Sequence, residues 1–404
     1  MEPKIRLKGF TGVWKEKPLL DVATLYNGLT YTPNDIRERG TLVLRSSNVQ
    51  EGEISLLDNV YVRSEVATSP NVEKGDIIVV VRNGSRALIG KHAQIKTDMP
   101  NTVIGAFMAG MHTDEPEFMN ALLCTSRFDK EVTINLGATI NQITNGTFRS
   151  MKFLFPDKKE QKALGAYFQQ LDSLIQSTSK KIDSLKQVKA ASLQSMFPQE
   201  GETTPRVRFK GFEREWEKVT LGDCLTINNE RNQNNVYGIN DVLSVSDEVG
   251  VVNQIKLLGR SYAGKSVANY RVLKTNQIVY TKSPLKSKPY GIVKVNKGSV
   301  GIVSVLYAVY DAKDDVCPDY IHYYFDPTYR INNYLLPLIN KGAKNTMNIS
   351  DEMALTGSIW IPSYKEQQKI SDYLHVLDSQ ITLQTQRLEK LKQIKSACLD
   401  NMFV

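Results

Sequence analysis

The sequence predicts an α+β protein in which two globular, mixed α/β domains are held apart by two long antiparallel coiled-coil helices and related by a pseudo-two-fold internal duplication. Three observations lead to this prediction. The chain contains one pattern twice, each copy ends in a long heptad pattern, and the segments before the heptads contain short runs of β-branched residues. The 404 residues are enough for two to three domains of ordinary size.

The duplication is clearest at the two ends of each copy. Ile5 to Val22 recurs as Val207 to Cys224, with 7 identities in 18 positions. Phe153 to Phe197 recurs as Ile359 to Phe403, with 17 identities in 45 positions and no gap. A period of this length excludes a solenoid. We therefore predict four segments, which are a domain at 1–156, a helix at 157–198, a second domain at 199–361 and a second helix at 362–404.

Both helical segments carry a heptad seam, in which apolar or neutral residues recur at alternating steps of four and three. Capping boxes begin both segments, Asp157 with Glu160 and Ser363 with Glu366: the first side chain covers a free backbone N–H and the glutamate reaches back. Pro198 ends the first helix. The seam consists of Leu164, Phe168, Leu171, Ile175, Thr178, Ile182, Leu185, Lys189, Ser192 and Met196 in the first copy, and of Ile370, Leu374, Leu377, Ile381, Gln384, Leu388, Leu391, Lys395, Cys398 and Met402 in the second.

The two seams are predicted to pack on each other as an antiparallel pair. In a parallel pair, Lys189 and Lys395 would fall in the same core layer, where two buried ammonium groups repel at short range. An antiparallel pair separates these two lysines. Other proteins could also cover the seams, but pairing within one chain is the more economical explanation. At about 1.5 Å per residue, each helix would be roughly 60 Å long.

The segments before the helices are expected to contain a sheet with short helices between the strands. Runs of β-branched residues bounded by Gly, Asn or Ser predict strands at Thr41–Val49, Asp76–Val81, Ile278–Thr281 and Ser299–Tyr310. Helical stretches are expected at Glu117–Phe128 and Asp319–Leu335.

Charge and composition narrow the possible functions. The chain has 51 Lys and Arg against 43 Asp and Glu, and this net charge of +8 suits nucleic-acid binding without establishing it. The cysteines and histidines show no metal-ligand spacing, so we expect neither a zinc site nor a disulfide framework. The longest charge-free apolar stretch, Ser299 to Tyr310, is too short to span a membrane, and no signal-peptide pattern opens the chain. The cytoplasm is therefore the expected location.

Two motifs resemble catalytic signatures without the context that these signatures need. GRSYAGKS (Gly259 to Ser266) fits the phosphate-binding pattern G-x(4)-G-K-S, but the residues after it allow at most two helical turns before a strand. DPTY (Asp326 to Tyr329) is one residue short of the amine-binding motif of amino-methyltransferases, and Asp-Pro is a common turn or helix start. The sequence shows no Ser/His/Asp or Cys/His set and no carboxylate cluster with metal spacing. We therefore expect no catalytic residues and no metal site in this chain.

The repeated motifs resemble those of a known family. K-G-F-x(3)-W-x(4)-L-x-D opens each copy, and P-x(2)-K-E-Q…L-D…L-K-Q-x-K…M-F closes it, so that the set covers the whole chain. This duplicated set is similar to the specificity subunit of type I restriction-modification systems. The resemblance implies two target recognition domains, each of which reads one half of a split double-stranded DNA site. It also implies conserved helices that pack antiparallel and set the spacing between the halves.

The same resemblance implies partners. The helices would dock two modification subunits that methylate adenine, to which ATP-dependent restriction subunits can add. This chain would then be non-catalytic and hold no cofactor, while S-adenosylmethionine, ATP and Mg²⁺ would bind to the partner subunits. Two alternatives remain open: a stand-alone DNA-binding regulator or coiled-coil adaptor, and, with less support, a P-loop enzyme that uses NTP.

Polar loops in both domains supply candidates for DNA contact. Arg and Lys can bind guanine, Asn and Gln can bind adenine, and Ser, Thr and backbone N–H groups suit phosphates. Ordinary solvated loops have the same composition, so the choice rests on residue chemistry and loop placement alone. The candidates are Arg45, Asn48, Arg82, Asn83 and Arg86 in the first domain, and Lys282, Lys286, Lys288, Tyr290, Lys344 and Asn345 in the second.

Overall fold

The structure is a computed structural model that describes residues 2–136, 141–264, 266–283, 285, 288–341 and 347–404. It contains two compact units: Met1–Lys180 with Thr385–Val404 form the first, and Lys181–Gln384 form the second. Both units are mixed α/β, which confirms the predicted fold class. Each unit includes one end of each long helix, so the boundary between the units runs through both helices and not at their ends.

The first unit is built around an antiparallel sheet in the order β2-β11-β8-β9. Its central strand β8 reads IIVV, and all four side chains are buried because both faces of the sheet are covered. A second sheet has the order β10-β4-β7-β3, in which β10 and β4 run parallel. The strands are β1 (Lys15–Pro18), β2 (Ala23–Asn27), β3 (Ile36–Arg37), β4 (Thr41–Leu44), β5 (Val49–Gln50), β6 (Glu53–Ile54), β7 (Val60–Val62), β8 (Ile77–Val80), β9 (His92–Gln94), β10 (Thr102–Ile104), β11 (Met108–Thr113) and β12 (Lys152–Phe155), and the short helices are α1 (Pro116–Leu123), α2 (Ser126–Asn135) and α3 (Asn145–Ser150).

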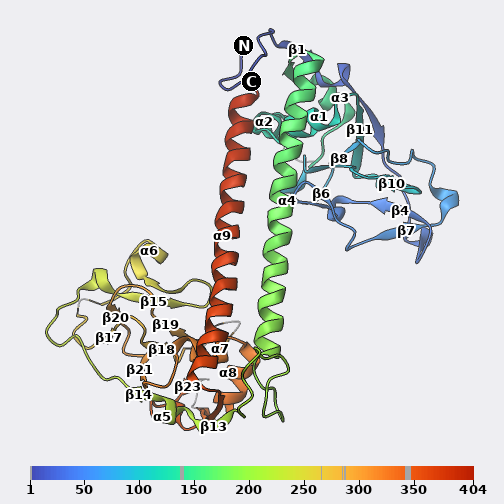
Figure 1. Cartoon of the computed structure of the whole chain (residues 1–404). Coiled ribbons are helices and arrows are strands. Elements are labelled where there is room, and N and C mark those ends of the chain that lie inside the picture. The colour runs from blue at the N-terminus through green and yellow to red at the C-terminus, as the bar shows by residue number, and fades with distance from the viewer. Residues whose placement is uncertain (1, 137–140, 265, 284, 286–287, 342–346) are drawn as a thin grey trace. The chain divides into compact units, whose positions relative to one another are not determined.

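The second unit repeats this sheet in the order β14-β21-β18-β19, and α7 packs against β19 (Figure 1). Smaller pairs join β13 to β24, β15 to β16, β17 to β20 and β22 to β23. The strands are β13 (Glu217–Thr220), β14 (Leu225–Ile227), β15 (Leu243–Ser246), β16 (Gly250–Asn253), β17 (Arg271–Leu273), β18 (Ile278–Tyr280), β19 (Val293–Val295), β20 (Gly301–Val303), β21 (Ala308–Ala312), β22 (Asn340–Lys341), β23 (Met347–Asn348) and β24 (Ser358–Ile361), and the short helices are α5 (Leu221–Cys224), α6 (Gln254–Leu258), α7 (Pro318–Phe325) and α8 (Thr328–Leu335).

The register of the two sheets confirms the duplication. Val80 at the end of β8 lies opposite Met108, and Tyr280 at the end of β18 lies opposite Ala308. Both members of the pair are therefore shifted by the same 200 positions. Arg82 lies two residues after the end of β8, and Lys282 lies two residues after the end of β18. The two residues therefore occupy equivalent positions in the two units.

Four predicted elements are wrong in detail, and each break has a local cause. Thr41–Val49 is not one strand, because the 3₁₀ turn Ser46–Asn48 separates β4 from β5. Ser299–Tyr310 is not one strand, because a turn between β20 and β21 interrupts it. The helix expected at Glu117–Phe128 breaks before Thr125, whose side chain caps α2 by accepting from the backbone N–H of Phe128 at 3.3 Å. The helix expected at Asp319–Leu335 breaks at Pro327, which cannot continue α7.

Two long helices follow the sheets, α4 (Lys158–Ser195) and α9 (Tyr364–Met402). Asp157 caps α4 as expected, since its Oδ1 accepts from the backbone N–H of Glu160 at 2.9 Å. The Glu160 carboxylate has a different role from the predicted one. It is 1% exposed and accepts two hydrogen bonds from the guanidinium group of Arg6, at 2.8 and 2.7 Å. Arg208 binds Glu366 at the start of α9 in the same way, at 2.6 and 2.8 Å.

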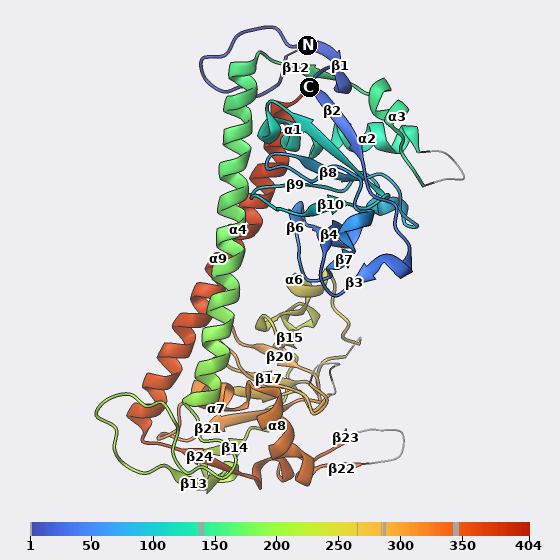
Figure 2. The same cartoon turned by 90° about the vertical axis from the view of Figure 1, so that its right-hand side faces the viewer.

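The long helices pack antiparallel inside each unit, and Figures 1 and 2 show the last turns of α9 beside the first half of α4 in the first unit. There the Tyr167 hydroxyl lies 3.3 Å from Cys398 Sγ, while Asp172, further along α4, pairs with Lys395, further back on α9. In the second unit, Lys189 of α4 pairs with Asp378 of α9. All twenty seam positions are buried or half-buried.

Candidate nucleic-acid interface

The end of β8 places Arg82 beside Phe107 in the first unit. The backbone N–H groups of Val81 and Arg82 donate to the Phe107 carbonyl oxygen at 2.9 and 3.2 Å, which fixes the two segments side by side. The Arg82 guanidinium carbon lies 5.2 Å from the centre of the Phe107 ring, a cation–π distance. Both side chains are exposed, Phe107 by 52%. Stacking on the ring already orders the guanidinium group. Its planar fork of N–H donors therefore loses little further conformational freedom when it binds a partner.

An open depression of about 650 Å³ lies beside this pair. Asn83 forms part of its wall, and its Nδ2 donates to Ser46 Oγ at 3.1 Å. Arg45 lies on the wall as well, so the structure brings together two of the predicted contact residues from loops far apart in the sequence. Arg86, in the short 3₁₀ turn after Asn83, is exposed but does not line the depression. The complete lining is Leu29, Thr30, Tyr31, Arg45, Ser46, Ser47, Asp58, Asn83, Gly105, Ala106, Phe107 and Met108.

The prediction for Asn48 needs correction. Its side chain is fully buried, and its amide group is used within the loop: Oδ1 accepts from the Arg45 backbone N–H at 2.9 Å, and Nδ2 donates to the carbonyl oxygens of Ser55 and Asp58. Asn48 therefore holds the loop in shape and is not displayed to a base. Arg45 is partly exposed and pairs with Asp58 at 2.8 Å, so its charge is locally balanced.

In the second unit, Lys282 occupies the position of Arg82 but is not free. Its Nζ pairs with the Asp351 carboxylate, to which the guanidinium of Arg271 also binds at 2.6 Å. Burial acts to raise the pKa of Asp351, but the hydrogen bonds from Lys282 and Arg271 outweigh it and hold that pKa below its usual range. Lys282 is therefore tied to a partly buried carboxylate.

Lys288 and Tyr290 also make contacts inside the unit, and the burial of Lys288 argues against its prediction as a DNA contact. The Lys288 side chain is 8% exposed, and its Nζ lies 2.8 Å from Asp247 Oδ1 and 2.7 Å from the Asp326 carbonyl oxygen. Tyr290 is half-buried against the core, and its carbonyl oxygen accepts from the Tyr280 hydroxyl at 2.8 Å. The remaining candidates, Lys286, Lys344 and Asn345, lie outside the described residues.

Sequence reasoning did not select the exposed Arg–aromatic pairs. Phe107 was missed because nothing in the sequence links a lone phenylalanine to Arg82. In the second unit Arg260 lies over the ring of Tyr262 at 4.6 Å from its centre, and Tyr262 is 60% exposed. Both residues belong to GRSYAGKS, a motif that resembles a nucleotide-binding loop and gives no sequence signal for a DNA contact.

The described residues in and after GRSYAGKS do not have the arrangement of a nucleotide-binding loop. Gly259 ends α6 in the left-handed conformation, with φ of 76°, and the described residues after the motif form a turn that leads into β17. A P-loop instead feeds a helix whose N-terminus holds the phosphates. The NTP-using alternative therefore has no structural support in this segment.

DPTY is a structural motif in this fold. Burial acts to raise the pKa of Asp326, but Lys294, His322, Lys189 and Lys288 outweigh it and lower that pKa far below its usual range. Asp326 is thus the centre of a lysine network at the end of α7. Among the described residues, no group of three or more His, Cys, Asp or Glu side chains could hold a metal ion.

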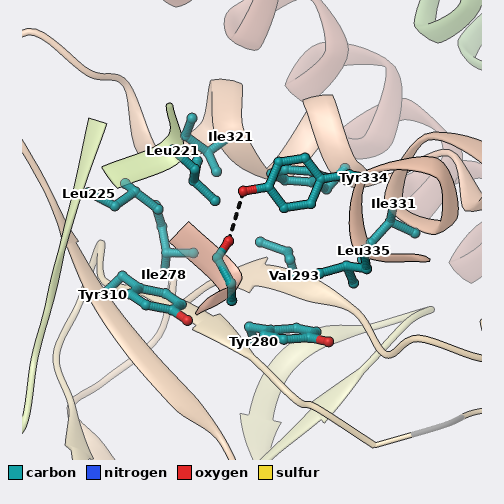
Figure 3. A pocket seen from close by; sticks show the side chains of 12 residues that line it. Leu221, Leu225, Ile278, Tyr280, Val293, Tyr310, Ile321, Ile331, Tyr334 and Leu335 are labelled. Carbon is teal, nitrogen blue, oxygen red and sulfur yellow. Dashed lines mark hydrogen bonds between the residues drawn. The ribbon is translucent and has the colours of Figure 1, made fainter. Parts of the chain in front are cut away.

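One small cavity is a packing gap in the core of the second unit, between α7, α8 and the sheet (Figure 3). It has about 20 Å³ of space and an almost entirely apolar lining that includes Leu225, Ile278 and Val293. The Tyr334 hydroxyl at its edge donates to the Ala354 carbonyl oxygen at 2.7 Å. This volume suits at most a single water, so the cavity is not a ligand site.

None of the described helices has the length and apolar character to cross a membrane.

Comparison with known proteins gives a consistent result. Residues 12–187 and 213–393 each match the family described as type I restriction modification DNA specificity domain. The type I restriction enzyme StySPI specificity subunit of Salmonella potsdam is 21% identical over 415 residues, which cover 94% of this chain and 87% of that protein. The type I restriction enzyme EcoKI specificity subunit of Escherichia coli K12 is 24% identical over 43% of this chain and 39% of that protein.

The fold also has a solved relative. The type I restriction-modification S subunit from M. genitalium has a TM-score of 0.62 at 12% identity, over 100% of this chain and 99% of that chain. Two family domains, one in each half, cover most of the sequence and agree with the repeated sheet order of the two units. The chain therefore belongs to the type I restriction-modification DNA specificity family.

Proposed function

We propose that this chain selects the DNA target of a type I restriction-modification complex, and that each unit reads one half of a bipartite double-stranded site. One observation carries the proposal: the two units share a sheet order and register but differ in the polar residues at equivalent loop positions. Arg82 in the first unit is exposed, whereas Lys282 at the same position is tied to Asp351. A common scaffold with different surface chemistry suits two readers of different base sequences.

In the first unit the reading surface consists of Arg82 with Phe107, the neighbouring Asn83 and the exposed Arg86. A guanidinium group can donate two hydrogen bonds to guanine O6 and N7, and an asparagine amide can pair with adenine in the major groove. Arg86 suits phosphate contact, which adds affinity without sequence information. The depression next to Asn83 gives the surface the concave shape that a duplex edge requires.

We further propose that α4 and α9 set the spacing between the half-sites and dock modification subunits. Both helices continue from one unit into the other, which makes them suited to fix a separation. Val188 on α4 and Ile394 on α9 occupy equivalent positions of the repeat and are 45% and 40% exposed. Exposed aliphatic side chains repeated on two helices suit two copies of one partner.

The chemistry of the complex is assigned to the partners. In this proposal two modification subunits use S-adenosylmethionine to methylate adenine, restriction subunits that use ATP and Mg²⁺ can join them, and this chain is non-catalytic. Because its proposed target is DNA, we place the complex in the cytoplasm. Family membership supports this division of labour.

The test is to express the chain with its modification subunits and map methylated adenines in the host genome. The expected result is one bipartite motif with a fixed spacer. Exchange of residues 213–361, which leaves α9 in place, for the matching segment of a relative should change one half of the motif and leave the other half intact. A motif that changes in both halves after this exchange would contradict the proposal.

A further inference from the structure

The second unit offers a different reading element from the first. We propose that the Arg260–Tyr262 pair in the loop after α6 is the base-reading element of the second unit, and that Arg260 recognises a guanine in its half-site. This inference rests on the proposed function and assigns a specificity residue outside the set of candidates predicted for the second domain.

The two described lysines of the 281–291 loop, Lys282 and Lys288, are already used within the unit. Lys282 shares Asp351 with Arg271, and Lys288 binds Asp247 and the backbone of Asp326. To reach DNA, Lys282 would have to leave the Asp351 carboxylate, which is 8% exposed, and Lys288 would have to give up its bonds to Asp247 and to the Asp326 carbonyl oxygen. The position equivalent to Arg82 is therefore unsuited to base reading in this unit.

Arg260 is in the opposite situation. It is exposed, and none of the carboxylates in the described part of the chain forms an ion pair with it. Its guanidinium carbon lies 4.6 Å from the centre of the Tyr262 ring. The first unit has the same combination, an exposed arginine over an exposed aromatic ring, in Arg82 with Phe107. Each unit thus has an exposed guanidinium group stacked on an exposed ring, and the two pairs come from different loops.

The Arg260–Tyr262 loop is anchored and not merely extended into solvent. The Tyr262 backbone N–H donates to Gln254 Oε1 at 2.7 Å, and Gln254 Nε2 donates to Ser244 Oγ on β15 at 3.2 Å. Asn253 caps α6 through two backbone N–H groups. Gly259, with φ of 76°, makes the sharp exit from α6 that an L-residue would adopt only with strain. The pair is therefore held on the sheet by side-chain bonds, which gives the positional precision that base reading needs.

Stacking and charge together point to a guanine. The planar guanidinium fork matches O6 and N7 of guanine, and the exposed face of Tyr262 can contact the neighbouring base or a thymine methyl group. A lysine would supply charge without the fork. We therefore expect one G·C pair in the half-site of the second unit to depend on Arg260.

The experiment uses the complete complex with Arg260→Ala, Arg260→Lys and Tyr262→Phe, together with Lys256→Ala as a matched control for an exposed cation on α6. Binding is measured on duplexes that carry each single base substitution, and the methylated motif is mapped in cells. Arg260→Ala should erase discrimination at one G·C pair of one half-site, a loss of roughly 5- to 150-fold, or about 1–3 kcal/mol. Arg260→Lys should lose most of this discrimination, Tyr262→Phe should keep it, and Lys256→Ala should weaken all sequences alike.

Two outcomes would overturn the inference. In the first, Arg260→Ala leaves the methylated motif unchanged while Lys282→Ala relaxes recognition of one base. In the second, Arg260→Ala lowers the affinity for every sequence by the same factor, as loss of a phosphate contact would. Circular dichroism of each variant checks that the unit is folded. If the unaltered complex methylates no bipartite motif at all, the proposed function fails; if it does and Arg260→Ala has no effect, only this inference fails.

Discussion

Lys189 on α4 and Asp378 on α9 form an ion pair, with Nζ 2.8 Å from Oδ1, and the first unit repeats this pair with the helices exchanged. There Lys395 on α9 lies 2.6 Å from Asp172 on α4. The lysine and the aspartate belong to the same repeated motif, so one motif supplies both members of the pair. Each lysine meets an aspartate only when the helices run antiparallel, because a parallel register would bring the two lysines together.

Replacing Lys189 by methionine should destabilise the second unit by about 2 kcal/mol. The carboxylates of Asp378 and Asp326, both partly buried, would each lose the lysine ammonium group as a partner. Urea denaturation of the full chain, followed by circular dichroism, measures the change. The first unit provides the control: Lys395→Asp should destabilise it, and the added Asp172→Lys should restore most of the loss. If the double exchange is no more stable than the single one, the pair does not specify the helix register.

Arg82→Ala tests the reading surface of the first unit. Loss of the guanidinium should relax recognition at one half-site at a cost of about 1–3 kcal/mol, because only base contacts carry sequence information. Titration of the complex with duplexes altered in one half at a time measures it. Lys91→Ala, which removes an exposed cation at the start of β9, should lower affinity for all sequences. An equal loss at both half-sites with Arg82→Ala would contradict the division of labour between the units.

The sequence predicts the long helices and the duplication, but it does not predict ion pairs between residues that are far apart in the chain. The long helices follow from local periodicity, and the duplication follows from a comparison of the chain with itself. Arg6 and Glu160, by contrast, are 154 positions apart, and no periodic pattern links them. From its sequence context, Lys288 resembles a free loop cation. Its partner Asp247 precedes α6 and β17 in the sequence, so no local pattern links the two residues. Residue type can nominate a base contact, but only the fold shows which cations are already neutralised.

Arg6→Ala should destabilise the first unit. Glu160 is 1% exposed, so removal of its partner leaves a buried carboxylate without compensation. Thermal unfolding of the full chain measures the change, and Arg208→Ala is the matched variant in the second unit, where Glu366 is equally buried. The double variant Arg6→Ala with Glu160→Gln should recover part of the stability, since no charge then remains buried. If Arg6→Ala alone is as stable as the unaltered chain, the motif arginine has no part in the start of α4.

His322 should make the second unit sensitive to acid. Burial first, and then the charge of Lys294, lower the pKa of His322 to about 4, against about 6.5 for a free histidine. Its Nδ1 lies 3.1 Å from the Val293 carbonyl oxygen, and Asp326 offsets the lysine only in part. Between pH 4 and 6.5 the unfolded chain therefore binds more protons than the folded one, so stability rises with pH across this window and is lost as the pH falls.

The expected loss between pH 6.5 and 4.5 is roughly 2 kcal/mol, less than the full shift implies because part of the ring remains exposed. Urea midpoints at the two pH values measure it. His322→Phe should flatten the slope, because the ring remains but the titrating group is removed. The lowered pKa of Asp326 acts in a separate, more acidic window, below the usual carboxyl range. A slope that is identical in the unaltered chain and in His322→Phe would show that the buried imidazole does not control the response to acid.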